Sequence, residues 1–175
     1  PGAGKTTLLK ALAEEGYQVV PEVAREIIKE QVETGGDAVP WANVALYTEF
    51  MLKCSVEGYM EHVKNEYIVF FDRGILDTVC YSEMIGNGIS AEMDAYARNC
   101  LYNRTVFILP PWFEIYATDE ERKQNWEEAE TTYHKMKAIY ERYGYNVVDV
   151  PRDQVENRKD FVIFSLDKDV KNNRI

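Results

Sequence analysis

The strongest constraint on the fold is the alternation of short apolar runs with longer segments of helical period. Residues 67–71, YIVFF, carry apolar side chains on both faces, which is typical of a central parallel strand covered by helices on both sides. Three more runs have strand character, at residues 17–20, 105–109 and 146–150. Because helical segments separate these runs, the sequence predicts a three-layer α/β/α sandwich with a central parallel sheet.

Helices are predicted in the intervals between the strands. Apolar residues repeat every three or four positions over residues 5–16, 23–33, 41–64 and 122–143. We interpret the stripe in the last of these segments as a packing surface and not as a cofactor site. Two capping-box patterns predict helix starts near Asp119 and Gln154.

Composition narrows the class of protein. The chain has 175 residues, of which 46% are hydrophobic, enough for the core of one domain spanning residues 1–175. Its 20 basic and 30 acidic residues give a net charge of −10, which disfavours a nucleic-acid or anionic-membrane surface. Three cysteines without close spacing disfavour a disulfide framework or a zinc site. No apolar run approaches the roughly eighteen residues of a membrane helix, and no signal peptide is visible, so we expect a cytoplasmic protein.

The first residues, PGAGKTT at positions 1–7, match the end of the phosphate-binding pattern G-x-x-x-x-G-K-[ST]. The opening glycine of that pattern and the strand that precedes it would lie before Pro1, so we expect the first strand of the sheet to be missing from this sequence. An amphipathic helix follows the glycines, which makes the match more specific. The sequence therefore predicts a nucleotide site, and the alternative is a glycine-rich helix start that binds no ligand.

The loop residues have distinct parts in this prediction. Glycines allow consecutive backbone N–H groups to point at phosphate oxygens, and the helix that begins at Lys5 adds its positive end. Lys5 would reach the outer phosphates of ATP, and the Thr6 hydroxyl would bind the Mg²⁺ ion that bridges them. Thr7 would support the loop. The predicted cofactor-binding residues of the loop are Gly2, Ala3, Gly4, Lys5, Thr6 and Thr7.

A second Mg²⁺ ligand is expected at the carboxyl end of a buried strand. Asp72 directly follows YIVFF and fits that position, although an ordinary turn aspartate would look the same. The D-R-G sequence at residues 72–74 differs from the D-x-x-G switch of GTPases. Residues 157–160, NRKD, carry the letters of the guanine motif N-K-x-D in another order, and we interpret them as a solvated helix face. An Asp-Arg pair at a strand end instead suits small-molecule kinases, where Arg73 would hold phosphate or a substrate hydroxyl.

Four segments together resemble a known family: residues 1–7, 19–28 (VVPEVAREII), 70–74 (FFDRG) and 109–124 (LPPWFEIYATDEERKQ). They resemble the small AAA-type P-loop ATP-binding proteins that are similar to the ribosylnicotinamide kinase domain of the bacterial NAD regulator. More distantly, the plan is similar to the deoxynucleoside and nucleoside-monophosphate kinases. The resemblance implies a P-loop NTPase fold with a small lid, and it leaves the substrate open.

Glu22 follows the predicted strand at residues 17–20, so its carboxylate should lie at the same sheet edge as Asp72. The resemblance to nucleoside kinases implies that Glu22 meets the acceptor hydroxyl; the alternative is a first-turn glutamate that favours the helix dipole. Arg25 is either a clamp for a substrate anion or part of a surface ion pair. Asp77 either faces the same cleft or only starts the next helix.

Residues 112–124 are the expected lid. In kinases of this fold the lid brings arginines onto the transferred phosphate and excludes water. Arg122 is the expected lid cation, and the alternative is that it only pairs with Asp119. Trp112 either stacks on a nucleoside-like ring or packs at the hinge. The resemblance also implies that Arg152, after the last predicted strand, packs on adenine.

Two functions are consistent with these residues. The first is a Mg²⁺-dependent kinase that transfers the γ-phosphoryl group of ATP to a hydroxyl or phosphate of a nucleoside-like small molecule. Its predicted catalytic residues are Lys5, Glu22, Asp72, Arg73 and Arg122. The second is a regulatory ATPase or switch that acts on a partner protein, in which Glu22 would position water. The intact loop disfavours a domain that has lost nucleotide binding.

Overall fold

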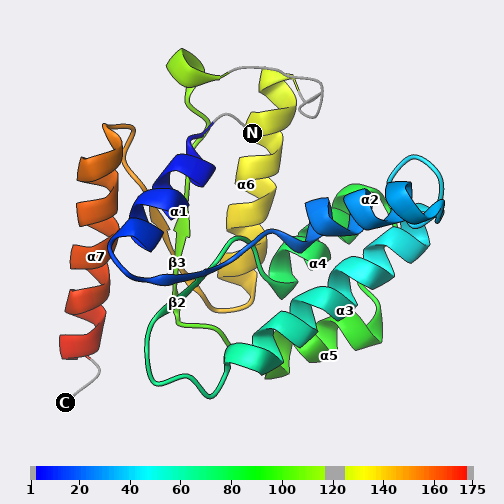
Figure 1. Cartoon of the computed structure of the whole chain (residues 1–175), viewed down its shortest axis with the longest axis horizontal. Helices are drawn as coiled ribbons and strands as arrows, with labels where there is room; N and C mark the ends of the chain where they lie inside the picture. Colours follow the sequence, from blue (N-terminus) through cyan, green and yellow to red (C-terminus); the bar gives the residue numbers. More distant parts are fainter. Residues whose placement is uncertain (1–2, 117–124, 173–175) are drawn as a thin grey trace. The chain divides into compact units, whose positions relative to one another are not determined.

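The computed structural model describes residues 3–116 and 125–172. Figure 1 shows the order of the elements along the chain. They are α1 (Lys5–Glu14), β1 (Gln18–Val20), α2 (Val23–Thr34), α3 (Val44–His62), β2 (Val69–Phe71), α4 (Ile75–Met84), α5 (Ala91–Asn99), β3 (Thr105–Ile108), the 3-10 helix η1 (Phe113–Ile115), α6 (Trp126–Arg142), β4 (Asn146–Asp149) and α7 (Val155–Asn172). The chain divides into two compact units: a central unit, Gln18–Tyr102, and a terminal unit formed by Pro1–Tyr17 and Asn103–Ile175.

In the central unit, β1 and β2 form a parallel pair with Val20 opposite Phe71 at the carboxyl ends. The connection between the two strands runs through α2 and α3, which pack against each other. Asn43 caps α3, since its side chain accepts a hydrogen bond from the Leu46 N–H at 3.2 Å. α3 also packs on α4, and α4 on α5, so each helix buries its apolar face on a neighbour. The buried side chains of this unit include Ile27, Tyr47, Met51, Ile75, Leu76, Val79 and Cys80.

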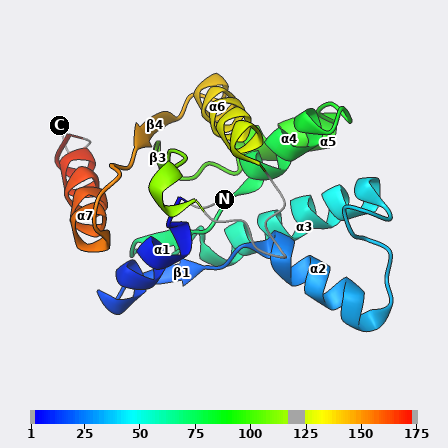
Figure 2. The same ribbon diagram turned by 90° about the horizontal axis from the view of Figure 1, so that it is seen from above.

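In the terminal unit, β3 and β4 form a second parallel pair, in which Thr105 lies opposite Asn146 and Ile108 opposite Asp149. α6 packs on both strands, α7 packs on β3, and α1 packs on α7. Figure 2 shows α6 and α7 on opposite sides of this strand pair. Helices on both sides explain why the middle residues of both strands are apolar. The buried side chains of this unit include Leu8, Leu12, Ile139, Tyr140, Val150 and Val162.

The predicted strands lie where the sequence placed them, each within two residues of the observed ends. Among the described residues they form two separate parallel pairs, β1 with β2 and β3 with β4, whereas one central sheet was expected. A continuous sheet needs a strand that is hydrogen-bonded on both edges, and the described pairs contain none. The strand expected before the glycine-rich loop stays a prediction.

The start of α6 is set by a capping box that the sequence reasoning missed. The Asn125 side chain accepts a hydrogen bond from the Glu128 N–H, and the Glu128 carboxylate accepts one from the Asn125 N–H, both at 2.9 Å. The helix therefore begins at Trp126. The start predicted near Asp119 lies outside the described residues. α7 begins one residue after the predicted start at Gln154.

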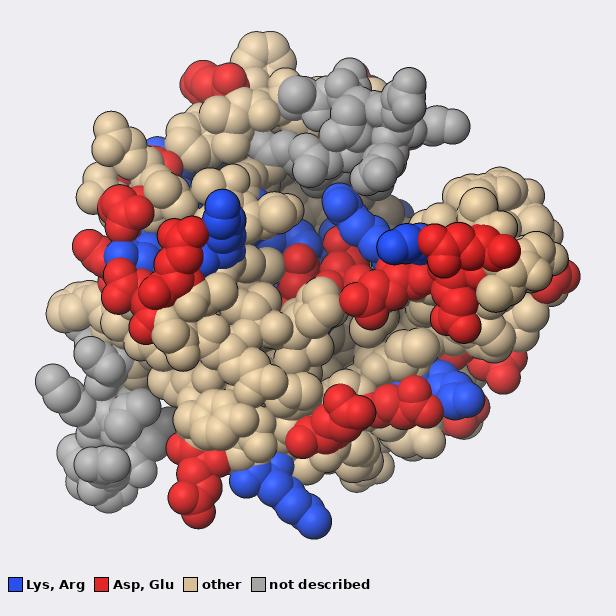
Figure 3. Space-filling view, in the orientation of Figure 1, with Lys and Arg blue, Asp and Glu red and all other residues tan. Residues whose placement is uncertain are grey.

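The surface of α2 carries charges of both signs. Figure 3 shows its acidic side chains interspersed with lysine and arginine, and Lys29 lies 4.0 Å from Glu33. Such exposed pairs contribute less than about 1 kcal/mol each. The cysteines Cys54, Cys80 and Cys100 are free, as their spacing predicted. None of the helices in the described ranges is long and apolar enough to cross a membrane.

Candidate functional site

The glycine-rich loop leads into α1 in the terminal unit. Gly4 is the N-cap residue, with φ 69° and ψ 24°, a left-handed conformation that glycine adopts without strain. Among the described residues no side chain caps this helix, and its first turn carries no acidic residue. A helix cannot satisfy the N–H groups of its own first turn, so these groups and the positive end of the dipole form an anion-binding position.

The predicted loop residues follow one another around this position. Lys5 is the first residue of α1 and is partly buried, while Thr6 and Thr7 have exposed side chains in the first turn. Ala3 precedes the N-cap residue, and its backbone carbonyl has a partner described below. Gly2 lies outside the described residues. The local geometry therefore suits phosphate binding, and the roles of the individual side chains stay predictions.

Arg158 is a residue of this region that the sequence did not indicate. It lies on α7, and its side chain is buried, with 4% of its surface exposed. Its Nη2 donates a hydrogen bond to the Ala3 carbonyl at 2.8 Å. Its guanidinium carbon lies over the Trp112 ring, 5.7 Å from the centroid. Trp112 therefore packs against a cation of its own chain.

The interpretation of residues 157–160 as a solvated helix face holds for Asn157 and Asp160, which are exposed, and is wrong for Arg158 and Lys159. Lys159 is buried as well as Arg158. The Lys159 amine donates a hydrogen bond to Glu15 at the end of α1 and lies 2.8 Å from Glu156. The physical reason is that α7 packs on α1, which turns this face inward. One signal was available: Val162 is buried, and it lies four residues after Arg158 on the same face of the helix.

In the central unit, two acidic residues stand at the carboxyl edge of the β1–β2 pair. Asp72 directly follows β2, and its N–H donates a hydrogen bond to the Val20 carbonyl at 2.8 Å. Glu22 is the N-cap residue of α2, two residues after β1 ends, and its side chain is 16% exposed. Because the strands are parallel, both residues lie at the same edge of the pair. This is the location that the sequence predicted for them.

Arg73 connects Glu22 to a third acidic residue, Asp77. Its Nε donates a hydrogen bond to Glu22 Oε1 at 2.6 Å, and its Nη1 donates one to Asp77 Oδ1 at 3.2 Å. Among the described non-glycine residues only Arg73 has a positive φ, at 76°. For an L-residue that conformation costs about 1–2 kcal/mol. Burial lowers the pKa of Arg73, but Asp77 and Glu22 outweigh burial and raise it above its usual value.

Asp77 starts a helix, which is one of the two alternatives left open by the sequence, and it also holds the arginine. It lies in the first turn of α4, and its Oδ2 accepts a hydrogen bond from the Gly74 N–H at 2.8 Å. Its other carboxylate oxygen accepts the bond from Arg73. The side chain is 10% exposed. Asp77 thereby fixes the direction in which the Arg73 side chain leaves its turn.

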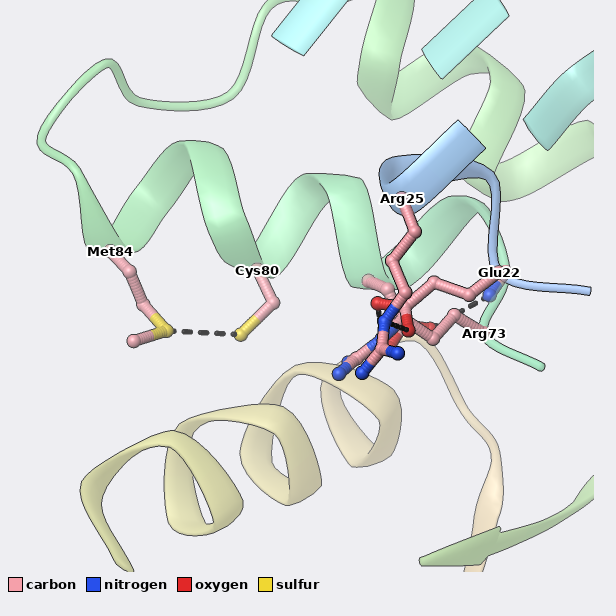
Figure 4. Close-up of polar contacts among 7 residues, drawn as sticks. Glu22, Arg25, Arg73, Cys80 and Met84 are labelled. Carbon is pink, nitrogen blue, oxygen red and sulfur yellow. Dashed lines mark hydrogen bonds and ion pairs between the residues drawn. The ribbon is translucent and has the colours of Figure 1, made fainter. Parts of the chain in front are cut away.

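Arg25 completes the group around Glu22. Its Nε lies 3.4 Å from Glu22 Oε2, and its side chain is 56% exposed. Figure 4 shows the side chains of Arg25 and Arg73 meeting at Glu22, beside the start of α4. Cys80 and Met84 lie further along the same helix, with their sulfur atoms 3.8 Å apart, and take no part in the group. Glu22 is thus held by two guanidinium groups.

Tyr47 on α3 is a buried neighbour of this group, in a segment for which the sequence predicted only a helix. Its ring meets the Tyr81 ring edge to face, with centroids 5.7 Å apart. Burial, together with Tyr81 and Glu22, raises the pKa of Tyr47 to about 12. Its hydroxyl is therefore a weaker acid than that of an exposed tyrosine.

The remaining predicted residues are less defined. Arg152 is exposed in the loop after β4, and Arg122 lies outside the described residues. Of the expected lid, residues 112–116 are described, and Phe113 and Tyr116 both pack edge to face on Trp126. The roles of Arg152, Arg122 and the lid stay predictions.

Comparison with known proteins places the chain in a family. The family profile described as an AAA domain matches residues 1–158. The chain belongs to the AAA domain family. This membership accounts for the phosphate-binding loop at the start of α1, because the domain is a nucleotide-binding P-loop domain. Comparison with curated proteins gave no match.

A solved structure supports the same fold for this AAA domain. A deoxyadenosine kinase from M. mycoides, solved with the products dCMP and a flexible dCDP, matches with a TM-score of 0.61 and 17% sequence identity. The match covers 95% of this chain and 94% of that chain. At this identity the similarity shows an α/β P-loop NTPase-like fold, in agreement with the fold class expected from the sequence.

Proposed function

We propose that this AAA domain is an ATP- and Mg²⁺-dependent kinase that transfers the γ-phosphoryl group to a hydroxyl or phosphate group of a nucleoside-like small molecule. The observation that carries the proposal is Glu22, which stands at a strand edge beside Asp72 and is held by Arg73 and Arg25. A carboxylate fixed in this way suits the orientation of an attacking hydroxyl. The fold shared with a deoxyadenosine kinase supports the same class of reaction.

The donor end of the reaction is assigned to the loop. Backbone N–H groups from Gly2 to Thr6 would surround the phosphates, and Lys5 would approach the outer ones as a point charge. Positioning and electrostatic stabilisation supply most of the rate enhancement in phosphoryl transfer. In this proposal the preorganised loop therefore contributes more to catalysis than the acceptor side does.

The chain also offers suitable donors for Mg²⁺. The Thr6 hydroxyl and the Asp72 carboxylate are oxygen donors, which Mg²⁺ prefers. Among the described residues no group of three or more acidic, histidine or cysteine side chains forms a metal site by itself, which fits an ion held largely by nucleotide phosphates. When bound, Mg²⁺ would neutralise developing charge on the phosphates.

At the acceptor end, Glu22 accepts a hydrogen bond from the attacking hydroxyl and turns its oxygen toward the phosphoryl group. The transition state is loose, so orientation matters more than complete proton removal. Arg73 stabilises charge on the transferred group, and Arg122 from the lid does the same while the lid excludes water. Arg152 packs on adenine. In this proposal residues 1–175 form one cytoplasmic nucleoside-triphosphate-binding domain with a lid at 112–124.

An acceptor screen tests the proposal. ADP release is measured with Mg²⁺-ATP and a panel of nucleosides, deoxynucleosides and ribosylnicotinamide, for wild type and Glu22→Gln. We expect one acceptor class to raise ADP release, and Glu22→Gln to lower the acceptor-dependent rate by about 100-fold or more. Because Glu22 is assigned to the acceptor and not to ATP, the Kd for Mg²⁺-ATP should change by less than about threefold.

Two outcomes contradict the proposal in different ways. If no small molecule raises ADP release but a partner protein does, the chain is a regulatory ATPase or switch and the kinase assignment is wrong. If Lys5→Ala binds Mg²⁺-ATP as tightly as wild type, the loop is not the nucleotide site. Circular dichroism of each variant checks that the loss does not come from unfolding.

A further inference from the structure

The charge on Arg158 is compensated differently from the charge on its neighbour. Lys159 lies within 4 Å of three carboxylates, those of Glu15, Glu156 and Asp160. The described partners of Arg158 are the Ala3 carbonyl and the Trp112 ring, and neither is a carboxylate. A buried cation without a counter-charge is costly, and among residues 3–116 and 125–172 no carboxylate pairs with Arg158; burial lowers its pKa. Burying the charge of Arg158 therefore costs free energy, and the packing of α7 alone does not explain why the residue is buried there.

The position of Arg158 is defined by the loop. Its Nη1 occupies the space beside Gly4, since a Cβ atom on Gly4 would lie only 2.5 Å from it. Its Nη2 holds the Ala3 carbonyl, the last acceptor before the N-cap residue. The planar group rests on Trp112, which limits its rotation. Three contacts thus fix one guanidinium against two consecutive residues of the loop.

The Nε atom of Arg158 is a further observation. This atom is buried and has no hydrogen-bond partner among residues 3–116 and 125–172. The neighbouring first turn of α1 has a positive end and no acidic residue. Positive charge therefore gathers around the loop even though the chain as a whole has a net charge of −10. An anionic ligand at the loop would supply the missing counter-charge.

We infer that Arg158 is a positioning residue for the nucleotide site: it holds the Ala3–Gly4 backbone in its phosphate-binding conformation and adds positive charge for the phosphates of the nucleotide. This inference rests on the proposed nucleotide binding at the loop. Because the Ala3 carbonyl is tied to α7, the N–H groups that follow it keep their common direction toward the ligand.

The first measurement is the Kd of Mg²⁺-ATP and of inorganic tripolyphosphate by calorimetry. Arg158→Gln should weaken both by at least about tenfold, the size expected for a hydrogen bond to a charged group. Arg158→Lys keeps the charge but lacks the planar fork, so it should restore less than half of the lost binding free energy. Lys159→Gln is the matched control: it removes contacts between α7 and α1 but should change both Kd values by less than about twofold.

The second measurement is amide hydrogen exchange of the ligand-free protein. Without the Arg158 contact, exchange over residues 3–8 should become at least about fivefold faster. The rate over Ala91–Asn99 in α5 should stay unchanged, as should the rate over residues 3–8 in Lys159→Gln. This measurement needs no nucleotide and no activity.

The two measurements separate the possible failures. If Arg158→Gln folds and binds Mg²⁺-ATP within about twofold of wild type, or if Lys159→Gln weakens binding as much, the inference is wrong. Full recovery in Arg158→Lys would also overturn it, because charge alone would then suffice. If wild type binds neither probe, the proposed function fails, and exchange over residues 3–8 still decides whether Arg158 holds the loop. Should Arg158→Gln not fold, Arg158→Lys carries both measurements.

Discussion

At both candidate sites an arginine lies beside a backbone in the left-handed region, but the two sites reach this arrangement differently. In the terminal unit the left-handed residue is Gly4, with φ 69°, and the arginine is Arg158, which comes from a distant helix. In the central unit the left-handed residue is the arginine itself, Arg73, with φ 76°. In the glycine-rich loop, one residue adopts the left-handed backbone and another supplies the positive charge. In the turn after β2, Arg73 does both.

This difference in the residue that takes the left-handed conformation shows which residue each site depends on. Glycine takes the left-handed conformation without strain, so Gly4 serves the loop by having no side chain. Arg73 accepts a strain of about 1–2 kcal/mol, although glycine would fit there without it. Strain of this kind is typical of functional sites, because selection for stability alone would remove it. The bonds from the Arg73 side chain to Glu22 and Asp77 therefore explain why an arginine, and not a glycine, occupies this left-handed position.

The largest effect is expected from Arg73→Gly, which separates strain from charge. Glycine fits φ 76° and relieves the strain, but the ion pairs with Glu22 and Asp77 are lost. We expect the acceptor-dependent rate to fall by about 100-fold or more, while the free energy of unfolding changes by less than about 1 kcal/mol. Steady-state kinetics and urea denaturation measure the two quantities.

Arg25→Gln is the control for this change, since Arg25 pairs with the same carboxylate but is 56% exposed. Its effect on the rate should be at least about tenfold smaller than that of Arg73→Gly. If Arg73→Gly keeps a near-normal rate, the strained arginine has no functional role. If it unfolds the protein, the arginine serves stability. In either case the contrast between the two sites disappears.

A smaller effect is expected from Gly4→Ala, which tests the other half of the comparison. The new Cβ atom meets two obstacles: the positive φ and the Arg158 guanidinium 2.5 Å away. Gly16 has φ 94° and nothing within 4 Å of an added Cβ, so Gly16→Ala isolates the first obstacle. We expect Gly16→Ala to lower the free energy of unfolding by about 1–2 kcal/mol, and Gly4→Ala by about 1 kcal/mol more.

Nucleotide binding distinguishes the two alanine variants further. The Kd for Mg²⁺-ATP should rise by about tenfold or more in Gly4→Ala, because the loop must shift, and stay near wild type in Gly16→Ala. In an Arg158→Gln background the stability loss from Gly4→Ala should be smaller, since one obstacle is gone. Equal losses for Gly4→Ala in both backgrounds would show that the guanidinium does not restrict residue 4.

The sequence predicted those parts of the site that depend on local pattern. The helix start at Lys5 and the acids at the ends of β1 and β2 follow from glycine spacing and from apolar runs, which act within a few residues. The positions of the four strands and the α/β class follow from the same signals, whereas the division into two parallel pairs does not. Similarity to a solved structure over 95% of the chain shows the α/β P-loop NTPase-like class at only 17% identity, because the fold depends on pattern more than on particular residues.

Contacts between distant segments were harder to predict. Arg158 contacts Ala3, 155 residues away along the chain. The charged run around it is typical of a solvated helix face, and only the packing of α7 on α1 buries it. The capping box at Asn125 was missed because another capping pattern upstream was preferred. In both cases the residue type was compatible with two environments, and only tertiary contacts select between them.

The smallest effect is expected from a change at the end of β4 in the terminal unit, which is compared with the ends of β1 and β2 in the central unit. At the end of β4, Asp149 accepts hydrogen bonds from Tyr133 and from Lys137, the latter at 2.6 Å. Burial raises the pKa of Asp149, but the bonds from Lys137 and Tyr133 outweigh it, and the pKa falls below its usual value of 3.8. A lowered carboxylate pKa stabilises the folded state above that value, and the contribution is lost as the pH falls through the folded pKa.

Asp149→Asn should therefore lower the free energy of unfolding at pH 7 by less than about 1 kcal/mol, because the side chain is 42% exposed and solvent screens the pair. The difference from wild type should shrink as the pH falls below about 4. Urea denaturation between pH 3 and 7 measures it, with Tyr133→Phe as a variant that removes only one bond. The rate of phosphoryl transfer should stay unchanged, in contrast to Glu22→Gln. A loss as large as that from Glu22→Gln would mean that the β4 strand end also belongs to the proposed reacting site.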